Sequence, residues 1–311
     1  MALRAPLHGA AAFAELALAD PSPPLIAPFI ALGSVTLLFG PPSSGKTHLT
    51  ISMAAALVAG TPLWGVYPTQ KSRVLIVQAD MNSALYQERI RPNAALLTDN
   101  TLILATDGFP IDVCALKPTD PLVIAIREFA PHIVFVDTLR KTHNFGEIDD
   151  TTPDRVYTAW RTLLPGTAFV FLHHSRKLST SPDAAKIIAE AFRGSGAWAA
   201  SADTIIAQRR VRRANNSDWM TRLQFIRTRS CAEPAPILLR LTEELMLEPV
   251  AETRYEKALL AWIVANPKTT RVEGVKWLLA QRDSANNPLC SQATAYRVWD
   301  KIVRGEIRQG E

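Results

Sequence analysis

One stretch constrains the fold of this chain more than any other: Gly40-Pro41-Pro42-Ser43-Ser44-Gly45-Lys46-Thr47. It matches the pattern G-x-x-x-x-G-K-[ST], in which backbone amides surround phosphate groups. The apolar run at 35–39 predicts a buried strand before it, and the breaker-free run at 48–59 predicts a helix after it. Because the start of a helix attracts anions, this strand, loop and helix predict a site for a nucleoside triphosphate such as ATP.

Each part of the loop has an expected role in that site. Lys46 should reach the β- and γ-phosphates, and the hydroxyl of Thr47 should ligate Mg²⁺. The residues expected to line the nucleotide are Gly40, Pro41, Pro42, Ser43, Ser44, Gly45, Lys46, Thr47 and His48. The sequence thus predicts ATP and Mg²⁺ as the ligands.

Apolar segments and helical segments alternate along the next part of the chain. Strands are expected at 74–78, 101–105, 132–137 and 168–172, and helices around 85–90 and at 122–129 and 152–164. This alternation predicts an α/β fold with a mostly parallel central sheet covered by helices on both faces. Ligands of such sheets bind at the carboxyl ends of the strands. The residues at four of these ends are Gly40, Asp80, Asp137 and His174.

Two carboxylates at strand ends are candidates for the chemistry. Asp137 ends an apolar run, and we expect it to hold the Mg²⁺ shell together with Thr47. Asp80 is the candidate for the catalytic carboxylate that orients or deprotonates the attacking water. A helix cap for the segment that starts at Asn82 is the alternative interpretation of Asp80.

His173 and His174 follow the strand at 168–172. Because side chains alternate along a strand, only one of the two should face the site, and we favour His174 as a contact of the γ-phosphate. A metal-binding pair is the weaker alternative, since neighbouring side chains on a strand point apart and no third ligand spacing is present.

The order of these motifs gives the chain a resemblance to a known family. The motifs are Gly40…Lys46-Thr47, 74–80, 134–139, 171–177 and 192–198 with Ala202-Asp203. Together they resemble the RecA-like ATPases grouped around the plasmid replicative helicase RepA, over roughly residues 25–248. The resemblance implies a RecA-type core, ATP hydrolysis at subunit interfaces, and a hexameric ring that translocates on single-stranded DNA. Asp80 stands where the family usually has Glu, which affects the expected rate of hydrolysis but not nucleotide binding.

Residues 204–230 hold seven arginines and a single acid, Asp218, in a strand–turn–strand pattern. A solvated hairpin is one interpretation, but a block of charge this one-sided usually meets an anion. Arg227 and Arg229 resemble the family's Lys/Arg-x-Arg pair, which implies an arginine finger in the ATP site of a neighbouring subunit. The candidates for phosphate contacts with single-stranded DNA are Arg209, Arg210, Arg212, Arg213, Arg176 and Lys177. The loop at 178–191 and the segment 193–196 are expected to line a channel.

The chain is expected to divide into three parts. Residues 1–24 form an arm with a helix at about 10–19 and a Pro-rich linker, and the arm packs on a neighbouring subunit or covers its own domain. Residues 25–250 form the RecA-like ATPase domain. Residues 251–311 form a domain of three helices that resembles a winged helix-turn-helix. Its Thr294, Arg297 and Lys301 would contact duplex DNA, and docking of a replication protein is the alternative.

Composition excludes several classes of protein. The 311 residues are 48% hydrophobic and 20% charged, with a net charge of +5, as in ordinary globular proteins. The three cysteines are far apart and form no C-x-x-C pair, which argues against a zinc site or a disulfide framework. No apolar run reaches the length of a membrane span, and the first residues lack a leader pattern. We therefore expect a soluble, cytoplasmic protein that does not bind membranes.

These predictions favour an ATP-hydrolysing motor on single-stranded DNA, a replicative helicase acting as a homo-oligomeric, hexameric ring. One alternative is a recombinase or recombination mediator that uses the same core in a filament. The other is an ATP-gated DNA-binding adaptor or loader, in which Asp80 supports only slow hydrolysis and the last domain selects duplex sites.

Overall fold

The computed structural model describes a core and a C-terminal helical unit. The described residues are 9–10, 24–146, 151–175, 197–211, 219–250, 254–266, 269–282, 290 and 292–303. The helix expected at about 10–19 and the segments at 178–191 and 193–196 lie almost wholly or wholly outside them, as do Arg176, Lys177, Arg212 and Arg213.

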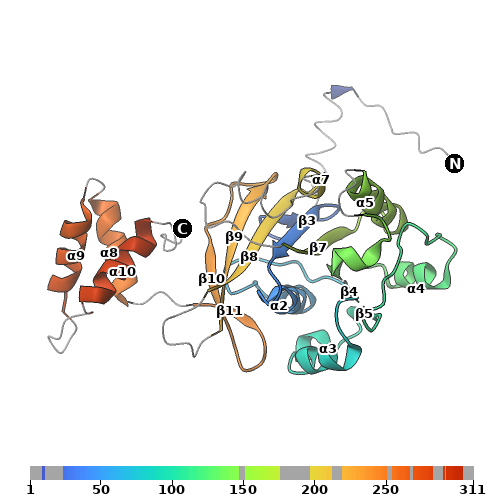
Figure 1. The fold of residues 1–311 in the computed structure, drawn as a ribbon, viewed down its shortest axis with the longest axis horizontal. Helices are drawn as coiled ribbons and strands as arrows, with labels where there is room; N and C mark the ends of the chain where they lie inside the picture. Colours follow the sequence, from blue (N-terminus) through green and yellow to red (C-terminus); the bar gives the residue numbers. More distant parts are fainter. Residues whose placement is uncertain are drawn as a thin grey trace.

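A nine-stranded sheet forms the centre of the core, in the order β11-β10-β9-β8-β3-β7-β6-β4-β5 (Figure 1). Its six parallel strands are β3 (Val35–Gly40), β4 (Val74–Gln78), β5 (Thr101–Ala105), β6 (Ile133–Asp137), β7 (Ala168–His174) and β8 (Thr204–Val211). The antiparallel strands at one edge are β9 (Met220–Thr228), β10 (Ile237–Leu241) and β11 (Leu247–Pro249). The predicted α/β fold with a mostly parallel sheet is confirmed.

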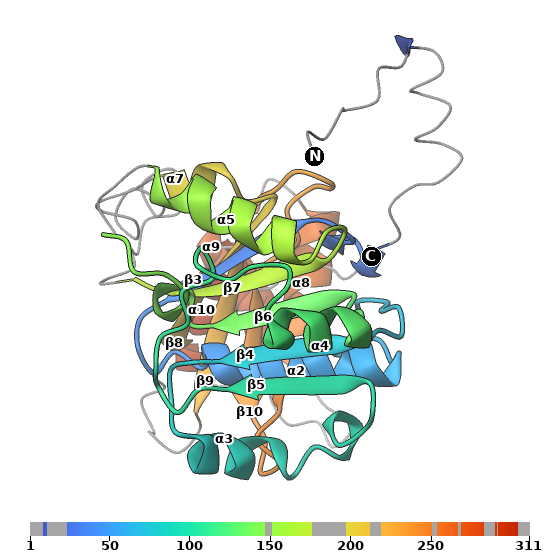
Figure 2. The same ribbon diagram turned by 90° about the vertical axis from the view of Figure 1, so that its right-hand side faces the viewer.

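Helices cover both faces of this sheet (Figures 1 and 2). One face carries α2 (Lys46–Ala59), α3 (Ser83–Ile90) and the 3₁₀ helix η1 (Ala94–Leu96). The other carries α4 (Pro121–Phe129), α5 (Thr152–Leu163) and α7 (Ala197–Ala200), and the 3₁₀ helix η2 (Leu139–Thr142) follows β6. Two short strands, β1 (Pro24–Ile26) and β2 (Ile30–Ala31), pair with each other ahead of β3.

Strict alternation along the strands creates two separate cores. Leu38 belongs to the apolar cluster on the α2 face, whereas Leu37 and Phe39 belong to the cluster with Trp160 of α5. Each fully buried side chain of this size contributes roughly 1.5–3 kcal/mol to folding. The same alternation decides which residues at the strand ends face the loop before α2.

Three helices form the C-terminal unit: α8 (Arg254–Ala265), α9 (Arg271–Ala280) and α10 (Gln292–Val303). They share a small apolar core, and a capping box formed by Thr270 and Glu273 starts α9. Gly274 packs so closely on Trp299 that a Cβ atom there would overlap with the indole ring.

The sequence predicts a domain of three helices here, and the structure describes three. Residues 283–289 and 291, between α9 and α10, lie outside the described residues, so the resemblance to a winged helix-turn-helix stays a prediction. The side chains of Thr294, Arg297 and Lys301 lie outside the described part of the chain, so their contact with duplex DNA stays a prediction. Within the described residues, no helix has both the length and the apolar character of a membrane span.

Candidate active site

The loop between β3 and α2 lies at the carboxyl edge of the sheet, with β7 on one side of β3 and β8 on the other. Gly45 precedes the first residue of α2 with a φ of 95°, a conformation that glycine adopts without strain. No side chain caps the start of this 14-residue helix by a hydrogen bond. Uncapped first-turn amides and the positive end of the helix dipole together suit a phosphate group.

Both glycines of the motif also make close approaches that a side chain would block. A Cβ atom on Gly40 would overlap with the backbone oxygen of Gln208, and one on Gly45 would overlap with the indole ring of Trp219. The glycines therefore let β8 and β9 press against the loop, in addition to leaving room for phosphates.

Lys46 is held inside the loop. Its side chain is almost fully buried, and Nζ donates to the carbonyl oxygens of Gly40 and Pro41, each at 2.9 Å. The same nitrogen lies 3.3 Å from Nδ1 of His174. Burial lowers the pKa of Lys46 to about 8, against the opposing attraction of Asp137 and Asp80.

Thr47 and Asp137 meet beside Lys46. The Thr47 hydroxyl donates to Oδ2 of Asp137 at 2.7 Å, and Asp137 is only 3% exposed. Burial raises the pKa of Asp137, and the hydrogen bond from Thr47 partly offsets this. A hydroxyl and a carboxylate are the hard oxygen ligands that Mg²⁺ prefers, so this pair fits the ion.

The donor set does not suit a metal ion held by protein alone. Among the residues that the structure describes, no group of three or more His, Cys, Asp or Glu side chains could hold one. Mg²⁺ is normally bound by one or two protein oxygens, with phosphates and waters completing its shell. The surroundings of Thr47 thus fit Mg²⁺ that arrives with a nucleotide.

Asp80 faces His174 across the carboxyl ends of β4 and β7. Oδ2 of Asp80 lies 3.6 Å from Nε2 of His174, and the hydrogen bond with His174 lowers the pKa of Asp80. Asn82, and not Asp80, caps α3, because its side chain accepts from the amide of Ala84 at 2.8 Å. Asp80 is therefore not the cap of this helix, and its role as the catalytic carboxylate stays a prediction.

The side chains of His173 and His174 point to opposite faces of the sheet, as the alternation of side chains along a strand requires. His174 points to the α2 side, between Lys46 and Asp80, while the ring centroid of His173 lies 6.3 Å from that of Trp198 on the opposite face. Since Lys46 can only donate, Nδ1 of His174 is assigned as the acceptor and Nε2 as the protonated nitrogen. His174 then lies between the lysine and Asp80, with a hydrogen bond from Lys46 on one side and the 3.6 Å contact with Asp80 on the other.

Arg227 and Arg229 lie away from this site within the same chain. Arg227 pairs with Ile205 near the start of β8, whereas the loop follows the end of β3. The guanidinium of Arg227 donates to the carbonyl oxygens of Ala199 and, at 2.6 Å, Ala202. In this chain the role of Arg227 is to fasten α7 to the sheet.

Arg229 makes similar contacts beside it. It donates to the carbonyl oxygen of Ala200 at 2.7 Å and to Asp203 at 3.2 Å, and Asp203 in turn accepts from the amide of Val35. The contribution of Arg227 and Arg229 to a neighbouring subunit's site therefore remains a prediction.

His48 was expected to line the nucleotide, but its side chain has other partners. Its Nδ1 lies 3.1 Å from the carbonyl oxygen of Leu245, and its ring packs edge-on against Trp219. The side chain is thus engaged by the turn between β10 and β11, and the expected contact of His48 with the nucleotide stays a prediction.

Several residues that support the loop were not predicted from the sequence. Gln208 Nε2 and Thr221 Oγ1 both donate to the carbonyl oxygen of Ser44, at 3.0 and 2.9 Å. Gln78 Oε1 accepts from the amides of Asp80 and Met81 and so fixes the turn after β4. A buried glutamine at a strand end was the one signal in the sequence that could have pointed to these supports.

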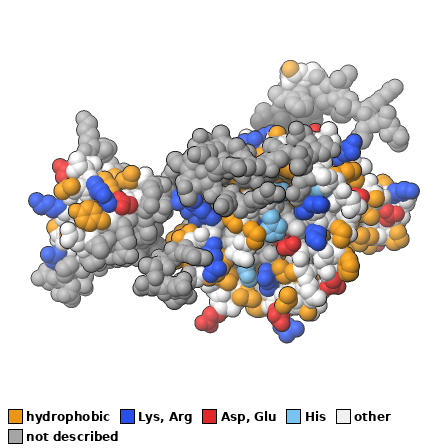
Figure 3. All heavy atoms as spheres, viewed as in Figure 1, with side chains coloured by type: hydrophobic (Ala, Val, Ile, Leu, Met, Phe, Trp, Pro, Cys, Tyr) orange, Lys and Arg blue, Asp and Glu red, His pale blue; other side chains and the backbone are white. Residues whose placement is uncertain are grey.

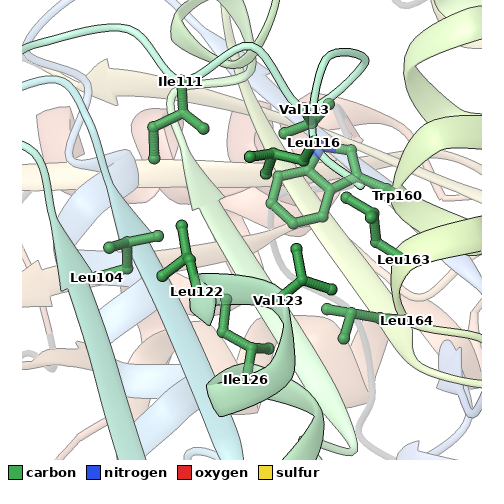
Figure 4. A pocket seen from close by; sticks show the side chains of 10 residues that line it. All are labelled: Leu104, Ile111, Val113, Leu116, Leu122, Val123, Ile126, Trp160, Leu163 and Leu164. Atoms are coloured by element: carbon green, nitrogen blue, oxygen red, sulfur yellow. The ribbon is translucent and has the colours of Figure 1, made fainter. Parts of the chain in front are cut away.

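An apolar cavity elsewhere in the core is a packing void. Figure 4 shows that its lining comes from β5, the loop after it, α4 and α5. The volume of the cavity is about 20 Å³. Its lining residues are Leu104, Ile111, Val113, Leu116, Leu122, Val123, Ile126, Trp160, Leu163 and Leu164. A space of this size among apolar side chains is too small for a substrate.

The depressed pKa of Lys46 predicts a pH dependence of nucleotide affinity. A triphosphate binds the ammonium form, which is lost as pH rises through about 8. The charged fraction falls roughly eightfold between about pH 7.5 and about pH 9, so the Kd for ATP should rise by about the same factor. Calorimetric titration at both pH values measures this change. In Lys46→Arg the Kd for ATP should not change with pH. A Kd that did not change with pH in the unmodified protein would contradict the expectation.

Comparison with known proteins adds three findings. A family model described as an AAA domain matches residues 9–180, a span that contains Lys46, Asp80, Asp137 and His174. A search of curated proteins gives no match. Among solved structures, the flagellar accessory protein FlaH from Methanocaldococcus jannaschii is similar, with 12% sequence identity and a TM-score of 0.47. The alignment covers 72% of this chain and 92% of that chain.

Proposed function

The chain belongs to the AAA domain family, and from this premise we propose that it is an ATP-hydrolysing motor that acts on single-stranded DNA as a homo-oligomeric ring. One observation carries the proposal. Lys46, Thr47, Asp80, Asp137 and His174 meet at one edge of the sheet, and the arginine-bearing strands β8 and β9 press directly against the same loop. The most specific form of the proposal is a RepA-like replicative helicase.

The residues of the site have distinct roles in hydrolysis. Lys46 exchanges its carbonyl partners for phosphate oxygens and stabilises negative charge on them. Asp80, kept ionised by its contact with His174, orients the attacking water and takes its proton as the bond from water to the γ-phosphorus forms. The bond from the γ-phosphorus to the β–γ bridging oxygen breaks in the same step, and ADP is the leaving group. Mg²⁺, held by Thr47 and Asp137, would supply further charge neutralisation at the phosphates. His174 contacts both Lys46 and Asp80, so it is placed to sense the γ-phosphate.

The charge on β8 and β9 supports nucleic acid as the partner. Figure 3 shows basic side chains over this edge of the sheet. Arg209 and Arg222 are cross-strand neighbours, so they offer two guanidinium groups on one face, while Arg210 lies on the opposite face beside the loop. Guanidinium groups in this arrangement suit the backbone phosphates of single-stranded DNA. Contacts with phosphates do not depend on the base sequence.

The described surroundings of the site support the proposed ring. In the part of the chain that the structure describes, no arginine is among the hydrogen-bond partners of Lys46, Thr47, Asp80 or Asp137. Phosphoryl transfer is commonly accelerated by an arginine from a neighbouring molecule. A subunit interface at this edge would supply it, with Arg229, about half exposed, better placed to move than Arg227.

Strand displacement on a forked DNA substrate tests the motor proposal. The unmodified chain with ATP should release the labelled strand, and Lys46→Ala should not. Electron microscopy of the protein on single-stranded DNA separates the alternatives, since rings support a helicase and continuous filaments support a recombinase. Sequence-specific duplex binding with ATP turnover at background would support a loader and contradict the motor.

A further inference from the structure

Trp219 occupies the space between the nucleotide loop and an arginine. The outer edge of its indole ring, at Cη2, lies so close to Gly45 that a Cβ atom there would overlap with it. The guanidinium carbon of Arg210, in β8, lies 5.6 Å from the centre of the same ring. Trp219 therefore contacts both Gly45, at the start of α2, and Arg210.

Neighbouring contacts fix Trp219 and its two partners to the sheet. The carbonyl oxygen of Trp219 accepts from the amide of Leu241 at 3.1 Å, which ties the start of β9 to β10. One position along the same face, Thr221 pairs with Arg210 across the strands and donates to the carbonyl oxygen of Ser44. A displacement of β8 against β9 at this point would therefore move both Ser44 and the ring on Gly45.

The contact with Trp219 leaves Arg210 able to bind an anion. A guanidinium group that lies over an aromatic face makes that contact through its π surface, and its N–H donors at the edge stay available. Arg210 is exposed and lies over the Trp219 ring, whereas the Arg227 guanidinium is engaged by two carbonyl oxygens. A phosphate group bound at Arg210 would thus be joined to Gly45 through one intervening side chain.

We propose that Trp219 is a positioning residue that couples a phosphate of single-stranded DNA on Arg210 to the affinity of the loop at Gly45 for MgATP. The inference rests on the proposed function, because that function supplies the DNA. The coupling between two binding sites is reciprocal. The factor by which DNA raises the affinity for nucleotide therefore equals the factor by which nucleotide raises the affinity for DNA. The coupling passes through contact and needs no large movement.

The experiment measures the Kd of a non-hydrolysable ATP analogue with Mg²⁺, by calorimetry, with and without an oligothymidylate at saturation. The coupling ratio is the Kd without DNA divided by the Kd with DNA. Allosteric coupling typically lies in the range of about 5–150-fold, and the unmodified protein should fall within it. Arg210→Ala and Trp219→Ala should each bring the ratio to about one.

Two further variants separate coupling from simple loss of structure. Trp219→Phe keeps an aromatic ring for Arg210 but lacks the outer ring atoms that meet Gly45, so it should lower the ratio only partway toward one. Arg240→Ala removes an exposed arginine on the neighbouring strand β10 and should leave the ratio unchanged. A purely structural role of Trp219 would shift both Kd values together and leave their ratio as it was.

The outcomes also distinguish this inference from the proposed function. If the unmodified protein shows a ratio well above one, and Arg210→Ala and Trp219→Ala keep it, the coupling role is wrong while the DNA-dependent function stands. If the unmodified protein shows a ratio of one, the proposed function loses its support and the inference falls with it. If Trp219→Ala does not fold, the ratio in Arg210→Ala decides the question, because that variant leaves the ring on Gly45 in place.

Discussion

Replacement of Lys46 with alanine is expected to lower the rate of ATP turnover by about 10²- to 10³-fold. Lys46 is a buried cation that lies within reach of His174 and is attracted by both Asp137 and Asp80. Alanine leaves these groups without the positive charge on which the transferring phosphate depends. Steady-state release of inorganic phosphate under saturating MgATP measures the loss.

A matched lysine controls for charge and for folding. Lys71 is exposed, and Lys71→Ala should keep turnover within about twofold, since surface substitutions of this kind have small effects. Circular dichroism melting curves of both variants show whether the fold is kept. If folded Lys46→Ala retained a tenth or more of the turnover, the assignment of the lysine would be wrong.

The second large effect is expected at Asp80. Asp80→Asn removes the proton acceptor and should lower kcat by about 10²-fold or more, because general-base catalysis contributes about 10²- to 10⁴-fold. The Kd for MgATP should change far less than kcat, since the Thr47–Asp137 pair and the amides of the loop remain and Asp80 adds only part of the attraction that keeps Lys46 charged. Single-turnover measurements and calorimetry on the same preparation separate the two quantities.

Asp80→Glu is the informative companion. This variant carries a carboxylate on a side chain one methylene longer. Glu is the usual residue at this position in the family that the chain resembles, so Asp80→Glu should retain or raise turnover. Wild-type kcat in Asp80→Asn would show that another group accepts the proton. A parallel loss in both variants would instead mean that the 3.6 Å contact between Asp80 and His174 needs the shorter side chain.

Much of the fold could be predicted because its signals are local. The apolar runs before Gly40, Asp80 and Asp137 became β3, β4 and β6, and the alternation of side chains placed His174 on the α2 side. The strands β1, β2, β10 and β11 were not predicted. They have only two to five residues, and their pairing partners lie elsewhere in the chain.

The orientation of Arg227 shows why some of the site could not be predicted. The pairing of β8 with β9 shifts between Ile205 and Ile206, so Ile226 has no partner across the ladder and Arg227 joins the face of Ile205, next to α7. A bulge of this kind arises from tertiary pairing and leaves no period in the sequence.

The residues that support the loop between β3 and α2 could not be predicted for a related reason. Gln208 and Thr221 reach the carbonyl oxygen of Ser44 across 164 and 177 residues of sequence. Trp219 on Gly45 is an equally distant contact. Motif spacing identifies the loop, but only the order of strands in the sheet reveals that β8 and β9 form one of its walls.

The most direct test of a ring-shaped, DNA-driven ATPase is turnover with and without single-stranded DNA, measured beside molecular mass by light scattering on the same sample. Turnover should rise several-fold when DNA is added and should be lost in Lys46→Ala. The mass should be that of a closed ring, six chains in the RepA-like form. Turnover that is the same with and without DNA, from a protein with the mass of a single chain, would contradict the proposed motor.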